Sequence, residues 1–114
     1  MIEIDSIDCV EPGYQPLFEV LMEALYQAQN GKGKECHANG LPFLEQPIMQ
    51  GAREAGEGGL VFQSRKKILE AKNCTDAARA IEDMLGAINY VAAQVILRRE
   101  KIAAASQVEP SSVK

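Results

Sequence analysis

The sequence predicts an all-α protein, a four-helix bundle-like domain with a long C-terminal helix. Apolar residues recur at three- and four-residue intervals in four segments, and no segment offers a convincing partner for a β-sheet. Tryptophan is absent and aromatic residues make up 5% of the chain, so we expect a core of Leu, Ile, Val, Ala and Met. The 114 residues are expected to form one domain: a flexible N-terminal arm at 1–13, a helical domain at 14–105 and a disordered C-terminal tail at 106–114.

Composition and charge narrow the classes of protein to consider. A hydrophobic fraction of 46% with 25% charged residues is typical of a soluble domain. The net charge of −4 argues against nucleic-acid binding, which depends on clustered cations. Three separated cysteines without a CxxC pair favour a reducing setting. We therefore expect a cytoplasmic protein with no membrane partner, since no apolar run reaches the ~20 residues that cross a bilayer.

The first two helices are predicted at about 16–29 and 47–56. Pro16 suits the first turn of a helix, and Asn30-Gly31 tolerates the left-handed backbone that ends one. The first helix carries an apolar stripe formed by Leu17, Val20, Leu21, Ala24, Leu25 and Ala28. In the second helix, Ile48, Met49 and Ala52 are the candidates for burial.

The third helix is predicted at about 60–72 and the fourth from Thr75 or Asp76 to about Ala104. Both candidate start residues can cap the fourth helix, and Asp76 adds a negative charge near its positive end. On the third helix, we expect burial of Val61, Phe62, Ile68 and Leu69, with Arg65, Lys66 and Lys67 largely outward.

The fourth helix has an apolar face wider than its three short partners cover, which predicts a homodimer. Ile81, Leu85, Ile88, Ala92 and Val95 follow a 4-3-4-3 spacing, widened by Met84, Val91 and Ile102. Asn89 lies within this face and can fix the register of an interface or line a ligand pocket. We favour the interface, with Leu85, Asn89, Ala92 and Val95 as its residues.

The loop GKGKECHANGLPFLEQPI at 31–48 is the first candidate for a binding site, because helix packing does not explain its composition. Its polar donors suit a small anion of nucleotide or phosphate type, and the loop can alternatively dock a protein partner. The predicted ligand-binding residues are Lys32, Lys34, His37 and Asn39, with Arg53 and Arg65 from neighbouring helices. The loop lacks the spacing of a P-loop, and a solvated turn explains the same residues.

An acidic set offers an alternative, enzymatic reading. Glu19 and Glu23 lie four apart on one helix face, and Glu82 and Asp83 lie on the long helix. This pattern resembles the all-α nucleotide pyrophosphohydrolases of the MazG type, and the resemblance implies Mg²⁺ held by these carboxylates. The chain departs from that family, with Val20 in place of an acid and Gly86 where the second motif needs one. A solvated acidic helix face is the simpler explanation.

A second resemblance rests on GKGKECHANGLPFLEQPIM and LGAINYVAAQVI and covers roughly residues 15–97. These motifs resemble small helical proteins of phages and other mobile elements, in which an arginine often precedes the histidine where this chain has Cys36. The resemblance implies an accessory protein and transfers no catalytic residue. The leading hypothesis is thus a non-enzymatic, dimeric mobile-element protein without cofactor that binds a small anionic ligand or a protein partner through the loop at 31–47. A structural oligomerisation protein is the further alternative.

Overall fold

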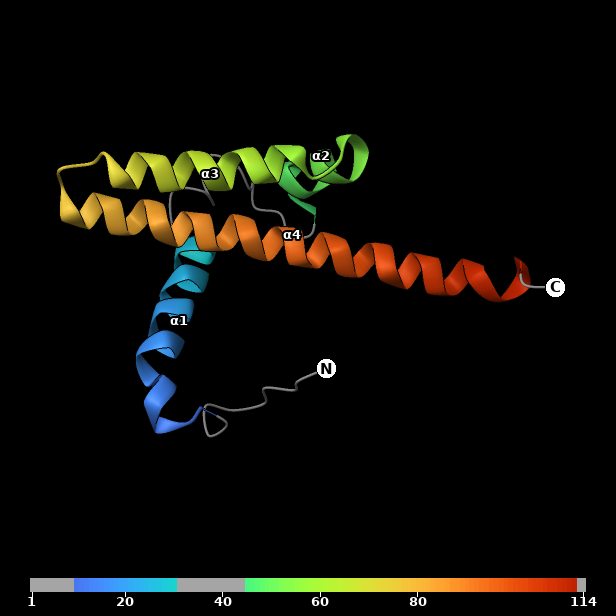
Figure 1. The fold of residues 1–114 in the computed structure, drawn as a ribbon, viewed down its shortest axis with the longest axis horizontal. Helices are drawn as coiled ribbons and strands as arrows, with labels where there is room; N and C mark the ends of the chain where they lie inside the picture. Colours follow the sequence, from blue (N-terminus) through green and yellow to red (C-terminus); the bar gives the residue numbers. More distant parts are fainter. Residues whose placement is uncertain (1–9, 31–44, 113–114) are drawn as a thin grey trace.

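The structure, a computed structural model, describes residues 10–30 and 45–112, with side chains described as far as residue 106. Within these ranges the chain forms a short 3-10 turn and four α-helices, which confirms the all-α, bundle-like fold. Helices α3 and α4 run side by side as a hairpin, and α2 packs against both of them (Figure 1). Helix α1 packs on α4 near one end and extends away from the hairpin on the side opposite α3.

Helix α1 spans Gln15–Asn30 and follows the 3-10 turn η2 at Pro12–Tyr14. These bounds agree within one residue with the predicted start and end. Its buried residue is Ala24, which is 2% exposed. Most of the predicted apolar stripe is therefore exposed in a single copy of the chain.

Helix α2 spans Pro47–Ala55 and helix α3 spans Gly58–Lys72. Gly56 links them with a φ of 97°, a conformation that a residue with a side chain rarely adopts. The core forms where these two helices meet the second half of α4. Its buried members are Met49, Ala52, Leu60, Ala93 and Leu97. The predicted burial of Met49 and Ala52 is thus confirmed, and Ile48 is partly buried against them.

The predicted inner face of α3 is wrong. Val61, Phe62, Ile68 and Leu69 are 47–62% exposed, whereas Leu60, Ser64 and Ala71 are buried. The reason is close packing against α4, because small residues let the two helices approach each other. The buried Ser64 hydroxyl donates to the Leu60 carbonyl at 3.0 Å and accepts from Gln94 Nε2 of α4 at 3.0 Å.

Helix α4 spans Ala77–Ser112, and its 36 residues span about 54 Å at the usual helical rise. Asp76 caps its start, as predicted: Asp76 Oδ1 accepts from the backbone N–H of Ala78 at 3.0 Å and of Arg79 at 3.4 Å. The helix passes the expected end at Ala104 and continues through Ser112, which corrects that boundary.

Ion pairs join α2 and the start of α3 to the C-terminal half of α4. Arg53 Nε and Nη2 each donate to a Glu100 carboxylate oxygen at 2.9 Å, a bidentate pair. Glu57 Oε2 accepts from Arg98 Nε at 2.6 Å and lies 3.9 Å from Lys101 Nζ. The Arg53–Glu100 pair links α2 to α4, beside the buried Met49 and Ala52.

Candidate functional site

The loop at the centre of the anion-binding hypothesis lies mostly outside the described residues. This applies to Lys32, Lys34, His37 and Asn39, so their arrangement stays a prediction. Of the two predicted helpers, Arg53 is bound to Glu100, and this pair raises the pKa of Arg53 through its hydrogen bond. Arg65 is exposed on α3. The described part of the chain therefore brings no two of the predicted ligand-binding residues into contact.

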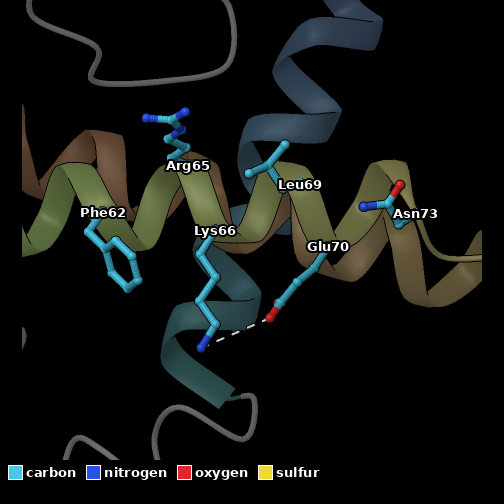
Figure 2. Close-up of a pocket in the computed structure, with 6 residues that line it drawn as sticks. All are labelled: Phe62, Arg65, Lys66, Leu69, Glu70 and Asn73. Atoms are coloured by element: carbon cyan, nitrogen blue, oxygen red, sulfur yellow. Dashed lines mark ion pairs between the residues drawn. The ribbon is translucent and has the colours of Figure 1, made fainter.

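Arg65 borders a surface depression of about 620 Å³ on the outer side of α3. The described residues that line it belong to α3 or to its C-cap Asn73: Phe62, Arg65, Lys66, Leu69, Glu70 and Asn73. Figure 2 shows Arg65 and Leu69 on one side of the helix and Phe62 and Lys66 on the other. Lys66 Nζ lies 4.0 Å from Glu70 Oε2, a solvent-exposed pair. The depression is a mixed apolar and basic surface, and its side chains do not converge on one point.

The four carboxylates of the magnesium alternative are not brought together. Glu19 and Glu23 are exposed on α1, and Glu82 is exposed on α4. Asp83 faces α3, with its Oδ1 3.7 Å from Lys67 Nζ. Among the described residues, no group of three or more His, Cys, Asp or Glu side chains is close enough to hold a metal ion. A single copy of the chain thus offers no magnesium site built from these residues.

Asn89 connects α4 to α1 within one copy of the chain. Asn89 Nδ2 donates to the Ala24 carbonyl at 2.9 Å and lies 3.4 Å from Gln27 Oε1. Gln27 Nε2 in turn donates to the Glu82 carbonyl at 2.9 Å. A Cβ added to Gly86 would lie 3.6 Å from Gln27 Oε1, an ordinary van der Waals contact, so this position has room for an alanine. The amide of Asn89 therefore has partners inside the chain, and polar bonds fix where α1 meets α4.

The side of α4 that faces away from α3 and α1 carries an apolar stripe, which we call the outer stripe. Its members are Ile81, Met84, Ile88, Val91, Val95 and Ile102. Ile88 is half-buried, and the others are 43–67% exposed. The buried side of α4 is formed instead by Ala87, Ala93 and Leu97. Of the predicted interface residues, Val95 belongs to the outer stripe, while Ala92 is exposed beside it and Leu85 is half-buried.

Helix α1 presents a second apolar surface. Its exposed large apolar residues include Leu17, Val20, Leu21 and Leu25, which are 40–55% exposed. They lie on the same side of the helix as Ala24, which packs on α4, or next to it. Towards its N-terminus, α1 extends past α4, and its main contacts with other described elements are with α4 and η2.

One described stretch, Ala77–Ser106, is long and apolar enough by composition to cross a membrane, with a mean hydropathy of 1.3 in its most apolar window and 17% of that window buried. Charged residues interrupt this stretch on both sides, so it contains no uninterrupted apolar run of about 20 residues. Its charge-free part extends from Met84 to Leu97, about 21 Å of helix against a hydrocarbon core of about 30 Å. One side of this part is also packed against α3. Length and composition alone are weak evidence for a membrane span.

Comparisons with protein-family models, with characterised proteins and with solved structures found no match to this chain. The resemblances to mobile-element proteins and to MazG-type enzymes therefore stay predictions. From the sequence, the outer stripe was not separated from Leu85 and Asn89, which are half-buried, because all of them lie on one broad apolar face of the predicted helix. The signal that could have separated it is the 3-4-3-4 spacing of Ile81, Met84, Ile88, Val91 and Val95.

Proposed function

We propose that this protein is a structural, self-associating helical protein whose working form is a homodimer. The observation that supports this proposal most directly is the outer stripe, an apolar surface of 43–67% exposed side chains on a helix that is packed on its other side. Soluble monomers rarely expose a contiguous apolar surface of this kind, and such surfaces commonly mark interaction sites. A cytoplasmic location belongs to the same proposal.

The energy available from the two apolar surfaces is of the size that dimerisation requires. Full burial of a Val, Leu or Ile side chain contributes about 1.5–3 kcal/mol, so a half-exposed one has about 1 kcal/mol still to gain. Five exposed members of the outer stripe in each of two copies offer about 10 kcal/mol. Association costs about 4–15 kcal/mol, so a stable dimer needs further burial, for which α1 has Leu17, Val20 and Leu21.

Sedimentation equilibrium of the full chain tests this proposal. We expect a monomer–dimer equilibrium in buffer without detergent, with the dimer dominant at micromolar protein concentration. A protein that is monomeric across the accessible concentration range contradicts the proposal. So does a protein that dissolves only with detergent or lipid, because the apolar surface would then belong to a membrane.

Binding of a small anion at the 31–47 loop is a second candidate function. It is favoured by Arg65, which is exposed and for which no ion pair is found within the described ranges. Isothermal titration against nucleotides and phosphorylated metabolites tests it, with a Lys34→Ala, His37→Ala double variant and Arg65→Ala compared with the unchanged protein. Absence of binding counts against the loop as the site. So does an equal affinity in the unchanged protein, the double variant and Arg65→Ala.

A further inference from the structure

The outer stripe repeats with the period of helices that pair along their length. Ile81, Ile88, Val95 and Ile102 are each seven residues apart, and Met84 and Val91 fill the intermediate positions. The 3-4 alternation holds over two heptads, from Ile81 to Val95, and Arg98 takes the next intermediate position. Such spacing keeps one side of a helix in contact with another helix. A rod-shaped partner of matching length therefore fits the stripe better than a compact ligand does.

From this surface we infer that a second copy of the chain occupies the outer stripe, with its α4 antiparallel to the first and a two-fold axis near Val91. This inference rests on the proposed self-association and adds the arrangement. A two-fold axis uses the same surface on both copies, so a single stripe is enough to form the contact.

The charges of α4 favour the antiparallel direction. The stripe is flanked by alanine and leucine in its first half, whereas Arg98 and Arg99 lie at its C-terminal end. A parallel pair would place each arginine beside its own counterpart, and Arg99 is exposed with no ion pair among the described residues. The antiparallel pair moves these counterparts apart by more than about 20 Å, which is beyond the Debye length at physiological salt.

Double electron–electron resonance, which measures distances between spin labels, tests this arrangement. In a background with Cys9, Cys36 and Cys74 replaced by serine, labels are placed on Arg79→Cys or on Ala104→Cys, two exposed positions on either side of Val91. Antiparallel pairing predicts about 35–40 Å between identical labels in the dimer. Mixing the two labelled chains predicts an additional short distance, about 10–20 Å, set by the helix separation.

The outcomes separate this inference from the self-association it rests on. Short distances between identical labels in a dimer overturn the antiparallel arrangement. A dimer that shows no short distance when the two labelled chains are mixed has its interface elsewhere. Neither of these two results contradicts the homodimer itself. A monomer by sedimentation overturns both proposals.

Discussion

A charge at the centre of the outer stripe gives the sharpest prediction. Val91 is 48% exposed in one copy, and valine and aspartate have similar helix propensities, so Val91→Asp should leave the fold of each copy intact. In the dimer, the substitution removes the remaining burial of two valines, about 1 kcal/mol each. It also places two carboxylates near the axis, which repel by about 2–3 kcal/mol at a separation of ~6–8 Å and an effective dielectric constant of ~20.

Together these effects weaken the dimer by about 4–5 kcal/mol, equivalent to a rise of the dissociation constant of roughly a thousandfold or more. Sedimentation equilibrium measures this constant, and circular dichroism reports whether helix content is kept. The matched control is Leu69→Asp, because Leu69 is 47% exposed on α3, away from the stripe. An unchanged dissociation constant for Val91→Asp, or an equal loss with Leu69→Asp, would refute the assignment of the interface to α4.

Three further predictions concern the stability of a single copy, each followed by urea unfolding. Met49→Ala should lower the free energy of unfolding by about 2–5 kcal/mol, because Met49 is fully buried in the core. Asp76→Ala should lower it by about 1 kcal/mol through loss of the cap of α4, and Asp76→Asn should restore most of it. The hydrogen bond from Arg53 lowers the pKa of Glu100, so the pair stabilises the protein above the unfolded-state pKa of about 4.3 and loses this contribution as pH falls through the lower folded value. The free energy of unfolding of Glu100→Gln should therefore be lower than that of the unchanged protein at pH 7, and the two values should converge in acid. A difference in this free energy that does not change with pH contradicts the role of the pair.

Apart from the end of α4, local signals predicted the helix boundaries well, because the residues that set them act on their own neighbours. Pro16 and Asn30 mark the ends of α1, and Asp76 caps α4 as its chemistry requires. The side on which a helix is buried was harder to predict. Helix α4 has no charged residue from Met84 to Leu97, so periodicity alone did not say which apolar side meets α3.

The packing of α3 depends on small residues, which a search for large apolar side chains overlooks. Ser64 and Ala71 are buried, while Phe62, the largest apolar residue of α3, is exposed. Arg53 was predicted to assist a ligand but binds Glu100, which is 47 residues away in the sequence. Such a pair becomes visible only when the fold brings α2 beside α4.

The separation of contacts along the chain has a consequence for the order in which the protein folds. Helices α3 and α4 are joined by a short turn, so their contacts close small loops and are expected to form early. Helix α1 reaches α4 through bonds such as Gln27 to the Glu82 carbonyl, which spans 55 residues. Joining α1 closes a longer loop and adds little buried surface, so it should dock last and open first. Amide hydrogens of α1 should accordingly exchange with solvent well before those at the centre of α4.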